Sequence, residues 1–101
     1  MASTQEYLNF ILEQLSKLSE ISYRMMMGEY ILYYRGKVFG GIYDNRFLVK
    51  ITKSSSALLP NASKEQPYEG AKEMLLVDEV EDKDFLAKLI KSMSEELPKK
   101  R

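Results

Sequence analysis

The chain has 101 residues, with 15 lysine and arginine residues against 15 aspartate and glutamate residues, and it contains no cysteine and no histidine. This length suits one domain, and 45% hydrophobic with 30% charged residues is typical of a folded globular protein. The composition excludes a disulfide framework, a thiolate nucleophile, a zinc finger and imidazole catalysis. A formal net charge of zero gives no general attraction to nucleic acid or acidic lipid.

The sequence carries no pattern of membrane insertion or export. Its longest apolar run, residues 30–34, is far shorter than the ~20 residues that a membrane-spanning helix needs. No basic segment followed by an apolar segment opens the chain, so we expect a cytoplasmic protein without membrane contact. We expect a single domain over residues 1–101, with a core from about residue 5 to residue 97 and a basic tail at residues 98–101.

A helix is predicted over residues 3–18, because apolar side chains recur there at steps of three and four residues. Ser3 followed by Glu6 has the spacing of a capping box, in which each side chain bonds the backbone N–H of the other residue. We therefore expect Ser3 to begin this helix.

The period then changes to that of β-strands, and extended runs follow at residues 23–27, 30–34, 38–43 and 46–51. The runs are separated by short turn-forming pairs, namely Gly28-Glu29, Arg35-Gly36 and Asp44-Asn45. Tight turns in succession predict an antiparallel meander.

Alternation in the last of these runs separates two faces of the expected sheet. Phe47, Val49 and Ile51 share the face that we expect the helices to cover. The opposite face mixes apolar with basic side chains, and we expect it to be partly solvated. Gly40-Gly41 lies inside a strand, so it indicates a bulge or close packing and not a dinucleotide site.

The second half of the chain is expected to add one short helix, one strand and a final helix. The serine run at residues 54–56 is interpreted as a helix cap, because no histidine is available to activate a serine nucleophile. Residues 64–72 are expected to form a loop and residues 73–77 a fifth strand. Asp82 can cap the final helix, which Pro98 ends. The elements together predict an α+β domain in which N- and C-terminal helices pack on an antiparallel meander.

Met25-Met26-Met27 is a deformable apolar run that can either fill a core or form an adaptable binding surface. A core strand is the favoured interpretation. Consecutive strand residues face opposite ways, so at least one of these side chains should point away from the helix-covered face.

Acidic residues gather at positions 78–84, where Asp78, Glu79 and Asp82 could bind Mg²⁺ in a small metal-dependent enzyme. The favoured interpretation is a negative helix N-terminus, where carboxylates complement the helix dipole.

Basic residues accompany the meander and are interleaved with tyrosines. Arginine beside tyrosine suits a protein interface or a phosphate backbone. The excess of basic residues is too small for an electrostatic footprint on DNA, so direct duplex-DNA binding is an alternative that we do not favour. The candidate interaction surface comprises Arg24, Met26, Tyr33, Arg35, Lys37, Arg46 and Lys50.

The segment Tyr23–Phe39 resembles the N-terminal domain of the TfoX/Sxy family of competence regulators. Pro67-Tyr68 and the residues 70–72 that follow are similar to the loop before the last strand of that family. Met27 stands where the family usually has phenylalanine, and Ile31 where it often has glycine. The family pattern falls here on Arg24, Met26, Gly28, Leu32, Tyr33, Gly36, Lys37 and Lys50.

The resemblance implies a meander sheet packed by terminal helices, similar to secretion-chaperone-like domains, without catalysis and without a cofactor. It also implies a link to transcriptional control of DNA uptake in bacteria. Full-length members carry a second, C-terminal helical domain that is not part of this sequence. We therefore expect a non-enzymatic regulatory or adaptor domain that binds a protein partner, such as the transcription machinery, and that can form a homodimer.

Overall fold

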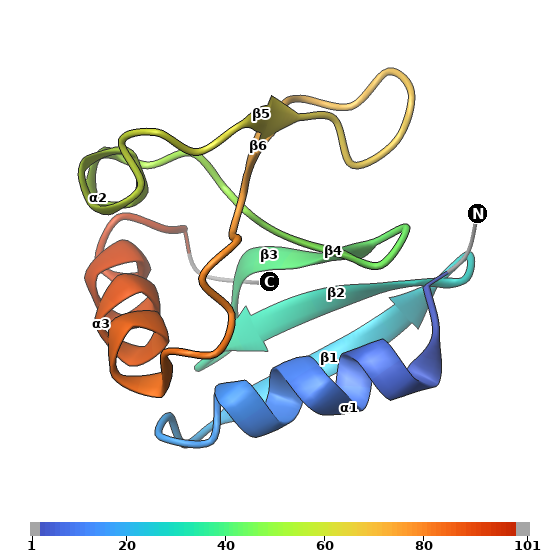
Figure 1. Cartoon of the computed structure of the whole chain (residues 1–101), viewed down its shortest axis with the longest axis horizontal. Coiled ribbons are helices and arrows are strands. Elements are labelled where there is room, and N and C mark those ends of the chain that lie inside the picture. The colour runs from blue at the N-terminus through green and yellow to red at the C-terminus, as the bar shows by residue number, and fades with distance from the viewer. Residues whose placement is uncertain (1–2, 99–101) are drawn as a thin grey trace.

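The computed structural model describes residues 3–98 of the chain. Within this range four strands follow the first helix, and two more strands lie between the second and third helices (Figure 1). The elements are α1 (Gln5–Gln14), β1 (Ile21–Met26), β2 (Glu29–Tyr34), β3 (Lys37–Tyr43), β4 (Arg46–Val49), α2 (Lys53–Leu58), β5 (Lys64–Glu65), β6 (Met74–Leu76) and α3 (Lys83–Ser94).

The strands form one antiparallel sheet in the order β1-β2-β3-β4-β6-β5. The first four strands follow one another in chain order, which confirms the predicted meander and the α+β class. β6 pairs with β4, and β5 lies beyond it. As a result, β1 forms one edge of the sheet and β5 forms the other.

Each of the first three hairpins turns through two residues with positive φ, the backbone geometry that matches the twist of antiparallel strands. The predicted position of the first turn, Gly28-Glu29, was wrong by one residue, because the turn is Met27-Gly28 and Glu29 already belongs to β2. The turn residues and their φ values are Met27 (53°), Gly28 (84°), Arg35 (54°), Gly36 (79°), Asp44 (55°) and Asn45 (56°).

Helix α1 begins at Gln5, and its N-cap lies one residue later than predicted. Thr4 is its cap, and the Thr4 hydroxyl accepts a hydrogen bond of 3.1 Å from the backbone N–H of Tyr7. Ser3 instead donates its hydroxyl proton to Glu29 across 2.6 Å, which ties the start of the helix to the first hairpin. The helix ends at Gln14 rather than at residue 18.

The other helix ends follow the same capping chemistry. Thr52 caps α2 in a reciprocal pair with Ser55. The serine run at residues 54–56 therefore lies inside the helix, and the prediction that it forms the cap was wrong. Asp82 caps α3 as predicted, accepting a bond of 3.0 Å from the N–H of Phe85. The predicted loop at residues 64–72 was wrong at its start, where Lys64–Glu65 forms β5.

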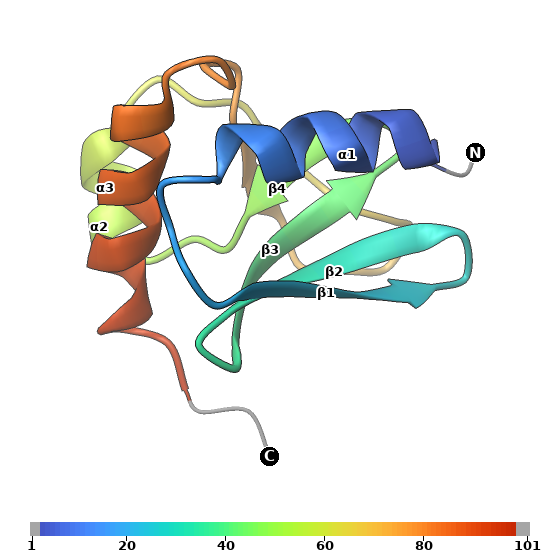
Figure 2. The same ribbon diagram turned by 90° about the horizontal axis from the view of Figure 1, so that it is seen from below.

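The main core lies between α1, α3 and one face of the sheet. In Figure 2, α1 runs along the strands and α3 stands at one end of them. Phe39 and Phe47 meet edge to face at 6.5 Å between ring centroids, both fully buried. Val49 joins them as predicted, whereas Ile51 follows the end of β4 and is 43% exposed.

The opposite face of the sheet carries a smaller cluster of Tyr43, Leu48 and Met74. Gly40 and Gly41 permit close packing here, as predicted. A Cβ on Gly41 would lie 2.5 Å from the carbonyl oxygen of Tyr30 and 2.6 Å from the ring of Tyr43. The register between β2 and β3 shifts between Leu32 and Tyr33, which pair with Gly40 and Val38, and this irregularity beside Gly40 is the predicted bulge.

No helix among residues 3–98 is long and apolar enough to cross a membrane. The basic tail predicted from residue 98 onward lies outside the described residues from residue 99.

Candidate interaction surface

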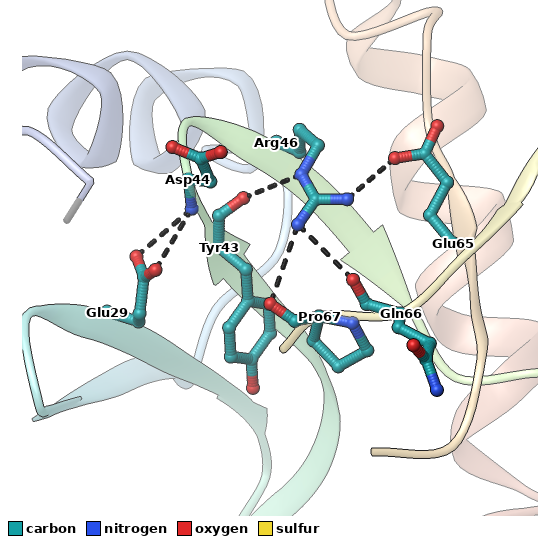
Figure 3. Close-up of polar contacts among 7 residues, drawn as sticks. All are labelled: Glu29, Tyr43, Asp44, Arg46, Glu65, Gln66 and Pro67. Carbon is teal, nitrogen blue, oxygen red and sulfur yellow. Dashed lines mark hydrogen bonds and ion pairs between the residues drawn. The ribbon is translucent and has the colours of Figure 1, made fainter. Parts of the chain in front are cut away.

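Arg46 is the most heavily engaged of the predicted surface residues. Its guanidinium donates to the carbonyl of Tyr43 at 3.0 Å and to the carboxylate of Glu65 at 2.6 Å (Figure 3). It also reaches the carbonyl oxygens of Gln66 at 3.3 Å and Pro67 at 3.5 Å. Four contacts to one side chain fix β5 and the loop behind it against β4.

Two further basic residues of the predicted surface have partners within the fold. Lys37 donates from Nζ to the carbonyl oxygen of Ser94 at 2.7 Å, at the C-terminal end of α3, where a cation complements the helix dipole. Arg35 pairs with Glu20 at 2.8 Å and lies over the ring of Tyr34, 5.8 Å from its centroid. Lys37 therefore has a partner at the end of α3, and Arg35 has one beside the β2–β3 turn, where its side chain remains 65% exposed.

Tyr33 and Lys50 lie on the sheet face opposite the main core, but in different surroundings. Tyr33 is buried, with 8% of its surface exposed. Lys50 is half-buried and lines a pocket of about 710 Å³ between the sheet and the loop at residues 66–73. Tyr43 borders the same pocket, and burial, followed by its neighbours Tyr68 and Glu29, raises its pKa. This hydroxyl therefore stays neutral at physiological pH.

Arg24, Met26 and Arg35 are the predicted surface residues that are exposed, and of these Arg24 and Met26 belong to β1. In the register of the sheet, Arg24 lies opposite Ile31 and Met26 lies opposite Glu29. Both therefore stand on the face away from the main core. The structure thus brings these two together and leaves the other five distributed between contacts of the sheet, α3 and the pocket.

The sequence analysis missed three neighbours of this pair. Tyr23 is 46% exposed, Met25 is 60% exposed and Met27 is 95% exposed. The interpretation of the methionine run as a core strand was therefore wrong, because β1 is an edge strand and α1 and α3 do not cover it. We call Tyr23, Arg24, Met25, Met26 and Met27 the β1 hairpin surface.

This surface presents apolar side chains on both sides of one strand. Tyr23 lies opposite Leu32 and Met25 lies opposite Tyr30, so their side chains stand on the face of the main core, at its margin. The ring of Tyr23 meets that of Tyr30 edge to face at 5.9 Å. Arg24 and Met26 occupy the other face, and Met27 forms the tip of the hairpin.

The acidic residues and the serine run singled out in the sequence lie apart from the β1 hairpin surface. Within residues 3–98 no group of three or more aspartate or glutamate side chains is close enough together to hold a metal ion. The Ser54 hydroxyl donates to Glu96 at 2.6 Å, and this bond is the main reason why the pKa of Glu96 lies below its usual range. Both groups lie at the surface, beside the start of α2.

The α+β architecture fits the result of a comparison with known families. Residues 13–95 match the model of the TfoX N-terminal domain. The match covers most of the chain, and the chain therefore belongs to this family of regulatory domains. It is a competence-regulator-like domain.

A relative from Spirochaeta aurantia supports this membership. It is described as an uncharacterized 12.7 kDa protein in the 5′ region of trpE, and it is 35% identical to this chain over 80 residues. The matched part is 79% of this chain and 70% of the relative. No solved structure shows a significant match to the chain.

Proposed function

We propose that this domain is a non-enzymatic regulator that acts in the cytoplasm by binding another protein through the β1 hairpin surface. The observation that carries the proposal is the exposure of consecutive apolar side chains along β1 and its turn, which culminates in Met27 at 95%. Exposed apolar residues gathered in one place are typical of protein interaction sites, whereas single ones are ordinary.

The types of residue support a protein partner. Methionine, tyrosine and arginine are enriched at the centres of protein interfaces, and lysine and glutamate are depleted there. Methionine side chains are flexible and polarizable, so one surface can adapt to partners of differing shape. Arg24 adds a charged group that can set the orientation of a bound protein.

The engagement of the basic residues disfavours direct binding to duplex DNA. Arg35, Lys37 and Arg46 each donate to a group of the same chain, and Arg46 does so from all three guanidinium nitrogens. The carboxylates paired with Arg35 and Arg46 offset these positive charges, and the chain has no net positive charge to attract a phosphate backbone. DNA contact at a promoter would then come from a partner, consistent with a role in the transcriptional control of DNA uptake.

The test compares the wild-type chain with one double variant and one single variant, each of which removes exposed apolar surface. Met25→Ser with Met27→Ser removes apolar area from the β1 hairpin surface, whereas Tyr68→Ser removes a 57% exposed ring from the loop that borders the pocket. Proteins captured by the wild-type chain are purified, and the Kd of each is measured by calorimetry.

We expect the double variant to weaken binding at least tenfold and Tyr68→Ser to leave the Kd unchanged. Equal affinities for all three chains would refute the proposed surface. Turnover of a substrate, or a rise in melting temperature with Mg²⁺ that Asp78→Asn abolishes, would refute the non-enzymatic assignment.

A further inference from the structure

The hairpin fixes which backbone groups of β1 face away from the sheet. In a hairpin with a two-residue turn, the residues that flank the turn form a hydrogen-bonded pair, here Met26 and Glu29. The N–H of Arg35 bonds the carbonyl oxygen of Glu20 at 3.1 Å, which places another such pair at the far end of β1. Bonding alternates along an antiparallel strand, so every second residue between these ends points its N–H and C=O outward. These outward residues are Ile21, Tyr23 and Met25.

Nothing in the described part of the chain occupies this edge. β1 has β2 as its one neighbour in the sheet, and Figure 2 shows β1 along the outer margin, on the side of β2 away from β3. The register with β2 runs without a shift from Ile21 to Met26, and the strand contains no proline. A regular edge strand of this kind can pair with a further strand, because its outward N–H and C=O groups have no partner strand. Natural sheets usually protect such edges with prolines, bulges or charges.

We propose that a second copy of the chain pairs with this edge, β1 against β1 in antiparallel order, about a two-fold axis at Tyr23. Such an axis keeps the helix-covered faces of the two sheets on the same side, so each residue must lie opposite one of the same face. Tyr23 then faces Tyr23 of the second copy, and Ile21 faces Met25 of the second copy.

We infer a second copy as the partner strand because the outward backbone groups of β1 can pair with those of another β1. With the axis at Tyr23, all three outward residues of each strand form hydrogen-bonded pairs. With the axis at Met25, Ile21 would extend past the hairpin turn of the second copy and remain unpaired. With the axis at Arg24, the two guanidinium groups would stand directly opposite each other, which is unfavourable. The axis at Tyr23 places Arg24 opposite Ser22 of the second copy.

Side chains along the pair are compatible with this register. Ile21 and Met25 would form an apolar contact on each side of a central pair of tyrosine rings. The formal net charge of zero adds no repulsion between copies. A single strand of six residues buries little area, so the association belongs with weak, transient interfaces.

This inference rests on the proposed function in using the same hairpin, but it uses different atoms. Pairing requires the backbone of Ile21, Tyr23 and Met25, whereas the Met27 side chain stands at the tip, beyond the paired strand. A different protein partner can therefore lose affinity with Met27→Ser while self-association persists. Conversely, loss of self-association with unchanged affinity for that partner would refute this inference and leave the proposed function standing.

The experiment uses the absence of cysteine from the chain, since any introduced thiol is then unique. Directly opposite residues in a hydrogen-bonded antiparallel pair have Cα atoms about 5.5 Å apart, within the range that a disulfide spans. Tyr23→Cys is therefore expected to form a disulfide-linked dimer under mild oxidation. Met27→Cys is the control, because its side chain is the most exposed on this surface and would link fastest by random collision.

A second measurement checks the register. Ile21→Cys and Met25→Cys, each made as a separate chain, should link to each other when mixed, at least tenfold faster than either links to itself. The wild-type amides of Ile21, Tyr23 and Met25 should also gain protection from hydrogen exchange as concentration rises. Linking of Met27→Cys as fast as Tyr23→Cys, or exchange at these amides that is independent of concentration up to millimolar chain, would overturn the proposal.

Discussion

Arg46 and Glu65 form an ion pair of 2.6 Å between β4 and β5, with each side chain 28% exposed. The two strands are separated by β6, so the pair reaches across a neighbouring strand. Through it and the carbonyl contacts beside it, the loop at residues 66–73 is held over the Tyr43 cluster (Figure 3). A residue that the sequence marks as a surface cation is therefore an internal brace.

Removing this brace should cost stability. Arg46→Met keeps the apolar stem and loses every hydrogen bond of the guanidinium, leaving Glu65 half-buried without its partner. We expect the free energy of unfolding in urea to fall by about 1–3 kcal/mol, the usual cost of unpaired partly buried polar groups. Arg24→Met is the matched control, because Arg24 is exposed on an edge strand, and it should change stability by less than about 0.5 kcal/mol. Equal effects of the two substitutions would contradict the bracing role.

Gly40 is expected to tolerate no side chain. A Cβ there would collide with the carbonyl oxygen of Leu48 and lie 2.9 Å from the Cα of Val49, both in the backbone of β4. Gly40→Ala should therefore lower the free energy of unfolding by about 3 kcal/mol, at the upper end of overpacking costs. Gly70→Ala is the comparison, since its surroundings are open and only its φ of +87° is strained. It should cost about 1 kcal/mol, and the reverse order would contradict the packing between β3 and β4.

Ser54 should control the ionisation of Glu96. The hydrogen bond from the Ser54 hydroxyl is the first cause of the low pKa of Glu96, followed by the bond from the Ser54 backbone N–H. Since the folded pKa is depressed, this contact stabilises the fold above the ordinary value of 4.5 and is lost as pH falls through the folded pKa. Ser54→Ala should raise the pKa of Glu96 in an NMR titration, and Ser56→Ala should not. An unchanged Glu96 pKa in Ser54→Ala would show that the bond is absent in solution.

Duplex DNA should not bind the chain in a salt-dependent manner. Fluorescence anisotropy of a labelled random duplex is expected to stay flat at about 50 and 200 mM salt, concentrations between which phosphate contacts weaken strongly. Binding that is lost at the higher salt and in Arg24→Ala would instead support the DNA alternative.

Much of the fold follows from local sequence rules. Hydrophobic spacing places α1 and α3, and the pairs Arg35-Gly36 and Asp44-Asn45 place two of the turns correctly. Asp82 is recognisable as a cap because a short acidic side chain precedes an apolar stripe. β5 escapes notice because two polar residues carry no strand period, and its pairing with β6 depends on the rest of the sheet.

The candidate surface was harder to predict, for a physical reason. Exposure of Met25, Met26 and Met27 depends on β1 being the edge of the sheet, and the order of strands is a property of the whole fold. The engagement of Arg46 likewise depends on Glu65, which lies close only after β5 joins the sheet beyond β6. The sequence could indicate residue types suited to an interface, but not which of these side chains are engaged in contacts within the fold.

Methionine methyl groups give the most direct test of the claim that the β1 hairpin surface binds a protein partner. Met25, Met26 and Met27 lie on that surface, whereas Met74 and Met93 are buried at 9% and 0% exposure and serve as internal controls. The chain is labelled with ¹³C at the methionine methyl groups, and its spectrum is recorded with and without an extract of the cells that make it. The account predicts that the signals of Met25, Met26 and Met27 broaden selectively, and that they recover when unlabelled wild-type chain competes but not when the Met25→Ser, Met27→Ser variant does. Signals that stay unchanged, or a competing variant as effective as the wild type, would contradict it.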